Sequence, residues 1–106
     1  MTSSYCMIYV TAASHAEALK IARALVDEKL AACANVLGEA TSIYRWQGKV
    51  EEAQELVLIA KTRRALADKA VERIKALHSY DEPCAVVYDI TGGLPTYLAW
   101  IAQETT

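Results

Sequence analysis

The sequence predicts a single α+β domain in which an antiparallel sheet carries two helices on one face. Three observations lead to this prediction: apolar strand-like segments alternate with two amphipathic segments, a hairpin signal lies between the central strands, and the chain has only 106 residues. That length suits one domain spanning residues 1–106. A chain of this size hides roughly two-thirds of the surface that its unfolded form exposes, so it can build a core of its own.

The first third of the chain predicts a strand, a helix and a second strand. The segment Tyr5–Thr11 is rich in β-branched and aromatic residues, as strands are. Ser14 and Glu17 have the spacing of a capping box, and apolar residues at helical spacing follow them. We therefore expect an amphipathic helix that ends near Lys29. The small apolar residues of Ala31–Leu37 predict a buried strand.

A long hairpin is predicted in the middle of the chain. After a loop at Gly38, the side chains of Thr41–Trp46 alternate between two faces of a strand. Gln47 and Gly48 then form a tight turn, in which glycine supplies a positive φ. The apolar run in Glu55–Lys61 is too short for a helix, so we expect a strand that is covered on both faces.

The last third predicts a helix, a strand and a short helix. Thr62 is expected to cap the second amphipathic helix, which stops near His78 ahead of Pro83. Cys84–Ile90 predicts the last strand, and Pro95 can open a short final helix. The order β-α-β-β-α-β with an additional C-terminal helix matches the ferredoxin-like arrangement, an antiparallel sheet with two helices on one face.

The apolar content is high for so small a two-layer domain. Hydrophobic residues make up 54% of the chain and charged residues 23%, which excludes a disordered chain. A two-layer sheet leaves one face bare, yet the predicted strands, above all Leu56–Ala60, are not polar at alternate positions. We therefore expect that oligomerisation covers the second face of the sheet.

Several partners and compartments are disfavoured. The net charge of −2 gives no basic excess for nucleic acid, and Gly92-Gly93 lacks the remaining residues of a phosphate loop. The chain has no apolar stretch long enough to span a membrane, and its first residues lack the basic start and long apolar core that are typical of a signal peptide. Its cysteines, Cys6, Cys33 and Cys84, form no CxxC pair. We expect a cytoplasmic protein with no membrane or nucleic-acid partner.

Residues that could catalyse a reaction or bind a metal are few. His15 belongs to the capping-box turn and is expected at the surface, whereas His78 closes the second helix. A Cys33/His78 pair has no local signature of a nucleophile and its base, so we expect no enzymatic activity. Cys33 and His78 are the candidate metal ligands, since thiolate suits Cu(I) and imidazole suits Cu(II) or Zn. The carboxylates at positions 51, 52 and 55 fit the polar rim of the hairpin better than a site for harder ions.

A set of polar and aromatic residues falls at strand ends and helix caps. Its members are Ser42, Tyr44, Trp46, Lys61, Thr62, His78, Tyr80 and Trp100. One interpretation is packing between subunits, where tryptophan and tyrosine are enriched. The other is a small-ligand pocket between subunits. Packing is the commoner cause of such enrichment.

Five segments, in order along the chain, resemble the CutA divalent-cation tolerance family. They are Leu30–Asn35, Ser42-x-Tyr44-x-Trp46-x-Gly48, Lys61-Thr62, His78-x-Tyr80-x-x-Pro83 and Tyr97-Leu98-x-Trp100-Ile101. The resemblance extends from about Tyr5 to Gln103. It implies a ferredoxin-like subunit, a tight homotrimer built by pairing the long hairpins, and a PII-like overall shape. It also implies a link to tolerance of copper and other divalent ions, with no established enzymatic reaction.

The resemblance assigns roles to individual residues. Cys33 matches the cysteine suggested as a thiolate ligand, and His78 matches a histidine that a proline usually follows, here replaced by Ser79. Cys84 stands where the family usually has a glutamate after the proline, and a thiolate there would favour softer ions. Some members carry a cysteine where this chain has Ser14 and His15. Residues that match the lining of the clefts between subunits are Tyr44, Trp46, Lys61, Tyr80 and Trp100.

These observations together predict a non-enzymatic homotrimer that acts in the response to divalent metal ions, copper foremost. It needs no obligatory cofactor and binds a metal ion or small ligand at the intersubunit clefts. The alternative is a PII-like signalling or scaffold trimer that docks an unidentified protein partner, with indirect effects on metals. A small acylphosphate-hydrolysing enzyme would need an arginine in a glycine-rich loop after the first strand, which Thr11–Ser14 does not provide.

Overall fold

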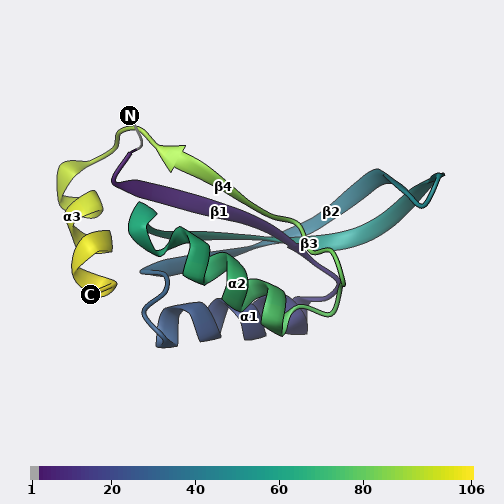
Figure 1. The fold of residues 1–106 in the computed structure, drawn as a ribbon, viewed down its shortest axis with the longest axis horizontal. Coiled ribbons are helices and arrows are strands. Elements are labelled where there is room, and N and C mark those ends of the chain that lie inside the picture. The colour runs from purple at the N-terminus through teal and green to yellow at the C-terminus, as the bar shows by residue number, and fades with distance from the viewer. Residues whose placement is uncertain (1–2) are drawn as a thin grey trace.

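The computed structural model describes residues 3–106 and has the predicted order of elements (Figure 1). The elements are β1 (Tyr5–Ala12), α1 (His15–Asp27), β2 (Cys33–Trp46), β3 (Lys49–Arg63), the 3₁₀ turn η1 (Arg64–Leu66), α2 (Ala67–Leu77), β4 (Ala85–Ile90) and α3 (Pro95–Glu104). The strands form one sheet in the order β2-β3-β1-β4, and all neighbouring strands are antiparallel. The ferredoxin-like prediction with an additional C-terminal helix is confirmed.

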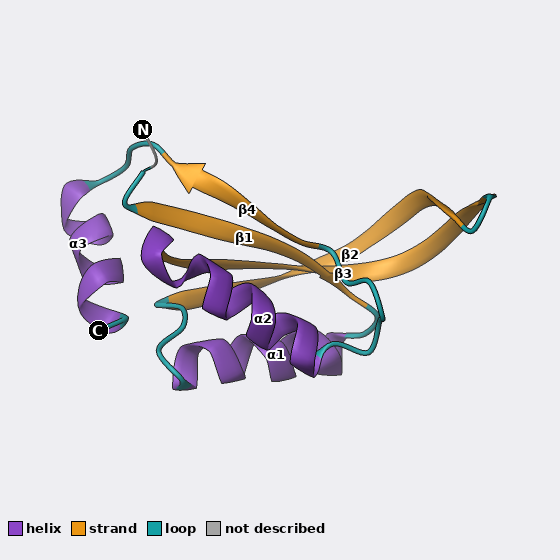
Figure 2. Cartoon of the chain, viewed as in Figure 1, coloured by secondary structure: helices purple, strands orange, loops and turns teal. Residues whose placement is uncertain are grey.

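One face of the sheet is covered by α1 and α2, which lie side by side beneath it (Figure 2). Every second side chain of β1 points to this side, and Ile8 and Val10 have no exposed surface. They pack in one cluster with Ile21 and Leu25 of α1 and with Ile74 of α2. The hydrophobic core of the chain therefore lies between the sheet and the two helices.

The opposite face of the sheet, which we call the bare face, has α3 only at its end near Cys33 and Lys61, and no layer of helices covers the rest of it. The alternate residues of β1, including Met7 and Tyr9, point to it and stay partly exposed. Beside them on β4, Val86 pairs with Tyr9 and Tyr88 pairs with Met7, and both are close to half exposed. The high apolar content of the sequence thus results in a sheet with apolar and aromatic side chains on both faces.

The β2–β3 hairpin projects beyond the rest of the domain (Figures 1 and 2). The molecule is 44 Å long, and its radius of gyration is 14.2 Å, whereas a compact chain of this length has about 13 Å. The predicted turn is confirmed: Gln47 has φ 49° and Gly48 has φ 80°, as the two central residues of a type I′ turn require. Along the hairpin Ile43 and Val50 are more than 60% exposed.

The predicted loop at Gly38 is wrong. β2 continues from Cys33 to Trp46, and a β-bulge between Leu37 and Glu39 takes up one extra residue at Gly38. A bulge changes the direction and twist of a strand without ending its pairing. Glycine therefore marks a bend here, and the two predicted strand segments are one long strand.

The predicted role of Thr62 as a helix cap is also wrong. Thr62 lies inside β3 opposite Cys6, its side chain is fully buried, and its hydroxyl has no hydrogen-bond partner among the described residues. The chain leaves β3 one residue later and passes through η1, so that Leu66 occupies the N-cap position of α2 without a side-chain cap. The last strand begins at Ala85, one residue after the predicted Cys84.

Among residues 3–106, no helix has both the length and the apolar character needed to cross a membrane.

Candidate functional site

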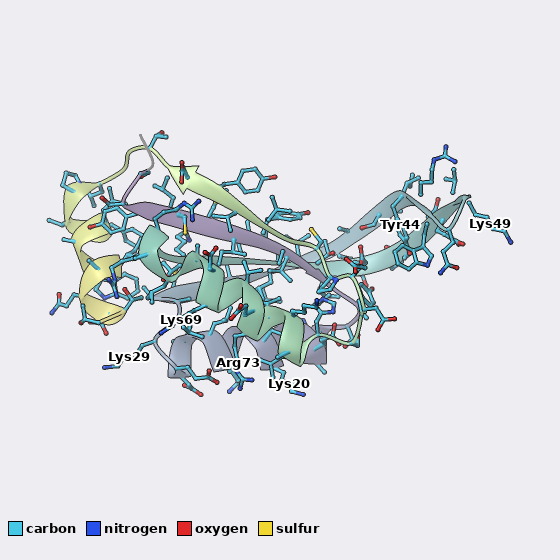
Figure 3. All side chains as sticks on the ribbon, in the orientation of Figure 1. Lys20, Lys29, Tyr44, Lys49, Lys69 and Arg73 are labelled. Atoms are coloured by element: carbon cyan, nitrogen blue, oxygen red, sulfur yellow. The ribbon has the colours of Figure 1, made fainter. Side chains whose placement is uncertain are left out.

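A pocket of about 600 Å³ opens on the bare face, where the hairpin leaves the body of the sheet. Its aromatic walls come from three parts of the chain: Tyr9 from β1, Tyr44 and Trp46 from the hairpin, and Tyr80 from the loop between α2 and β4. Figure 3 shows Tyr44 on the projecting part of the hairpin. A concave site of this size, with aromatic walls and a few polar groups, is typical of small-molecule sites.

The polar groups of the pocket are mainly acidic. Glu55 of β3 lines it together with Asp81 and Glu82 of the loop before β4. Hydroxyl and thiol groups complete the lining through Thr11, Ser42 and Cys84, and Ile43 also contributes. No lysine, arginine or histidine is among these lining residues of the described chain.

Glu55 and Tyr80 form the polar centre of the pocket. The Tyr80 hydroxyl donates a hydrogen bond of 2.9 Å to Glu55 Oε2, and Glu55 is only 6% exposed. Burial of the phenol and this bond to a carboxylate raise the pKa of Tyr80 to about 12. Tyr80 is therefore a neutral donor throughout the physiological pH range.

His78 holds the loop that carries Tyr80. Its Nδ1 accepts a hydrogen bond of 3.1 Å from the Tyr80 backbone N–H, and its Nε2 lies 2.7 Å from the carbonyl oxygen of Thr11. Both ring nitrogens of His78 are therefore occupied by backbone groups of the protein. The side chain of His78 is completely buried.

Glu17 fixes the same loop from α1. Its carboxylate accepts hydrogen bonds from the backbone N–H groups of Ala13, at 3.3 Å, and Ser79, at 3.2 Å, and Oε1 lies 3.5 Å from His78 Nδ1. Burial alone would raise the pKa of Glu17, but the hydrogen bonds from Ser79 and Ala13 outweigh it and lower that pKa. The predicted capping box is confirmed here, because Glu17 N–H also donates to Ser14 Oγ at 3.2 Å.

A second polar cluster surrounds Cys33 at the other end of the bare face. Lys61 Nζ donates to Asn35 Oδ1 at 2.8 Å and lies 3.8 Å from Cys33 Sγ, and the Tyr97 hydroxyl of α3 lies 3.4 Å from the same sulfur. The bond to Cys33, together with burial, raises the pKa of Tyr97. A smaller, mainly apolar pocket of about 370 Å³ lies beside Lys61 and Tyr97, next to Ile101.

The structure separates the two predicted metal ligands. Cys33 pairs with Lys61, whereas His78 binds Thr11, which pairs with Val57 four residues earlier on β3. Four residues of strand correspond to about 13 Å. Residues 3–106 contain no group of three or more His, Cys, Asp and Glu side chains that could hold a metal ion.

The structure places the predicted cleft residues in four different locations. Ser42, Tyr44, Trp46 and Tyr80 come together in the larger pocket, and Lys61 lies in the Cys33 cluster. Thr62 is buried on the opposite face of the sheet, the one that the helices cover. Trp100 projects from α3, where its ring lies 5.5 Å from that of Tyr97.

Sequence reasoning does not identify six of the residues that line the pocket: Tyr9, Thr11, Ile43, Glu55, Asp81 and Glu82. The sequence pattern predicts Glu55 in the polar rim of the hairpin, but in the structure it is one of the few buried charged residues. The sequence signal for this burial is that Glu55 directly precedes the apolar run Leu56–Ala60. A carboxylate at the start of a buried strand needs a polar partner. That partner, Tyr80, is 25 residues away in the sequence, so no local pattern identifies it.

The fold and the pocket define a class of protein: a small ferredoxin-like domain with a bare aromatic sheet face and an acidic aromatic pocket on that face. A sequence profile described as CutA1 divalent ion tolerance protein matches residues 6–104. The chain belongs to the CutA1 divalent ion tolerance family.

Individual relatives agree with this assignment. The chain is 46% identical over 99 residues to the divalent-cation tolerance protein CutA of Thermus thermophilus, covering 93% of this chain and 96% of that protein. It is 40% identical over 99 residues to the chloroplastic protein CutA of Arabidopsis thaliana; the match covers 93% of this chain but only 54% of that relative. The crystal structure of CutA from Xylella fastidiosa superimposes with a TM-score of 0.95 at 42% identity, covering 98% of this chain and all of that one.

Proposed function

We propose that this protein is a homotrimer that acts in the tolerance of divalent metal ions, copper foremost, through binding rather than catalysis. The observation that carries the proposal is the match to the CutA1 divalent ion tolerance family over residues 6–104. The relatives named for divalent-cation tolerance include a protein of nearly the same length, so the resemblance concerns the whole chain.

The bare face supports the proposed assembly. It presents Tyr9, Val86 and Tyr88 on adjacent strands, and the projecting hairpin adds Ile43 and Val50. Soluble monomers rarely leave contiguous apolar surface of this kind exposed. Pairing of the hairpins between subunits would cover both areas, and the pocket would then lie at a cleft between subunits.

The contacts of His78 and Cys33 support a binding role rather than a catalytic one. His78 is occupied by protein on both ring nitrogens and lies far from Cys33, so the two do not form a nucleophile and base. Cys33 instead contacts Lys61 and Tyr97. We propose that direct coordination uses the Cys33 thiolate together with ligands from a neighbouring subunit, and that His78 contributes only after its loop rearranges.

We place the protein in the cytoplasm as part of this proposal. Cys6, Cys33 and Cys84 are all free thiols, as suits a reducing compartment. The chloroplastic relative means that family membership alone does not fix the compartment. Fractionation of cells that express the native gene tests this part of the proposal directly.

Light scattering of the purified chain tests the assembly. We expect a mass three times the 11.6 kDa of one chain at low micromolar concentration. A stable monomer would contradict the proposal, because the bare face would then remain exposed in solution.

Metal titration of the reduced protein tests the role of Cys33. We expect Cys33→Ser to bind Cu(I) more weakly than the wild type, with Cys84→Ser as the matched control for a free, partly buried thiol. Identical affinities of the wild type and Cys33→Ser would remove Cys33 as a ligand. If no variant binds metal in the micromolar range and a cellular protein is retained by the trimer, a scaffold function replaces the proposed one.

A further inference from the structure

The larger pocket combines negative charge with aromatic rings. Glu55, Asp81 and Glu82 supply three carboxylates, and no basic side chain is among the described lining residues. Figure 3 shows Lys20, Lys29, Lys69 and Arg73 on the helical side of the molecule and Lys49 at the tip of the hairpin, and none of them lines the pocket. The charge of the pocket therefore favours a cation and disfavours phosphate or carboxylate ligands.

Glu55 is a buried carboxylate without a counter-charge. It is more than nine-tenths buried and forms no salt bridge with any residue of the described chain. Oε2 accepts the bond from Tyr80, but Oε1 has no hydrogen-bond partner among residues 3–106. Oε1 is not among the fully buried polar atoms of these residues, so it keeps access to the pocket that Glu55 lines. A carboxylate removed from water is stabilised by a nearby cation, and here that cation must come from outside the chain.

The aromatic rings indicate which kind of cation fits. Tyr9, Tyr44, Trp46 and Tyr80 approach the same space from β1, the hairpin and the loop before β4. Aromatic faces attract ammonium groups and pack against their alkyl substituents, but they do not coordinate a bare metal ion. The carboxylates of the pocket do not form a metal site by themselves, since the described residues hold no group of three or more His, Cys, Asp and Glu side chains that could hold a metal ion.

We infer that this pocket binds a small organic ammonium ion, with Glu55 as its counter-charge and the aromatic rings around its alkyl groups. The inference rests on the proposed function, because it names the ligand class of the cleft that the proposed trimer contains. The volume of about 600 Å³ lies in the range typical of small-molecule sites.

Calorimetric titration of the full-length protein with choline, and with its neutral isostere 3,3-dimethylbutan-1-ol, tests the charge requirement. The two probes have nearly the same shape and differ in the positive charge. We expect choline to bind and the alcohol to bind at least about tenfold more weakly, the ratio that corresponds to ~1.4 kcal/mol. Equal affinities, or no binding of choline at millimolar concentration, would overturn the inference.

Variants test the proposed contacts. We expect Glu55→Gln and Trp46→Leu each to weaken choline binding about tenfold, in line with the strength of desolvated cation–π contacts. The matched control is Glu72→Gln, which removes a carboxylate from the exposed surface of α2. Trp46 is 45% exposed, so its replacement tests the site even if Glu55→Gln fails to fold. Unchanged affinity in Trp46→Leu would contradict the inference.

The same samples separate this inference from the proposed function. A trimer that does not bind choline refutes the ammonium site alone. Choline binding by a monomer supports the site and refutes the proposed assembly. Displacement of choline by stoichiometric Zn²⁺ at Glu55 would show a metal site instead. A basic side chain of a neighbouring copy paired with Glu55 would also exclude the ammonium ligand.

Discussion

The two faces of the sheet are both largely apolar, yet the chain covers only one of them. On β1, Ile8 and Val10 are completely buried by the helices, whereas Tyr9, between them in the sequence, remains partly exposed on the bare face. On β4, Tyr88 is 49% exposed on the same side as Tyr9. The comparison teaches that alternation along a strand assigns side chains to faces, while the number of layers decides which face is buried within one chain.

The largest effect is expected from charged substitutions on the bare face, which should prevent assembly. We expect the double variant Val86→Asp/Tyr88→Asp to reduce the solution mass from three chains to one, because unpaired carboxylates in an apolar contact are strongly unfavourable. Light scattering measures the mass, and circular dichroism confirms that the helices remain. Lys75→Asp on the exposed side of α2 is the control. A trimer that persists in the double variant would show that assembly does not use the bare face.

Truncation on the covered face should cost more stability than truncation on the bare face of the same strand. We expect Ile8→Ala to lower the free energy of unfolding by about 2–5 kcal/mol, since it leaves a cavity in the core. Met7→Ala, one residue earlier, is the matched control. Both are measured in the monomeric Val86→Asp/Tyr88→Asp background, where no neighbouring subunit covers the bare face, and Met7→Ala should cost less there because its side chain is partly exposed. Urea unfolding at a single protein concentration gives both values. Equal losses would mean that the two faces are equally buried in solution.

The two histidines test the link between β1 and the loop before β4. We expect His78→Ala to destabilise the protein by about 1–3 kcal/mol, because it leaves the Thr11 carbonyl and the Tyr80 N–H without their partner. His15→Ala, at an exposed position of α1, should change stability by less than about 0.5 kcal/mol. Thermal unfolding of the two variants under identical conditions provides the comparison. A similar, small effect of both would contradict the structural role of His78.

The smallest effect is expected at alkaline pH, where the ionisation of Tyr80 reports on its environment in the pocket. Its folded pKa of about 12 is raised above the ordinary value of 10, so its contribution to stability is complete below pH 10 and is lost as the pH rises through 12. The difference in tyrosinate absorbance between the wild type and Tyr80→Phe should therefore develop near pH 12. In Glu55→Gln we expect the Tyr80 pKa to fall towards 10, because the acceptor carboxylate is removed. A Tyr80 signal that titrates near pH 10 in the wild type would refute the Glu55–Tyr80 pair.

Much of the fold could be predicted because it depends on short-range patterns. The capping box of Ser14 and Glu17 and the turn at Gln47-Gly48 require only neighbouring residues, and both form as predicted. The predictions for Gly38 and Thr62 are wrong for a related reason: glycine can mark a loop or a bulge, and threonine can cap a helix or continue a strand. Strand pairing across the sheet decides between these outcomes, and that pairing joins residues far apart in the chain.

The candidate site was only partly predictable. Ser42, Tyr44, Trp46 and Tyr80 were grouped by their residue types and do line one pocket. Glu55 was missed because its partner lies on another element. His78 has the residue type of a metal ligand, but its hydrogen bonds to Thr11 and Tyr80 make it a structural group in this chain.

The sequence by itself determined the order of the elements, the positions of the turn and the first helix cap, and the apolar character of both sheet faces. Only the tertiary structure decided the strand order, the face that the helices cover, and which aromatic and acidic residues meet at Glu55. The physical reason is range. Periodicity, capping and turn conformation arise from contacts within a few residues, whereas a pocket depends on contacts between segments that the chain itself separates.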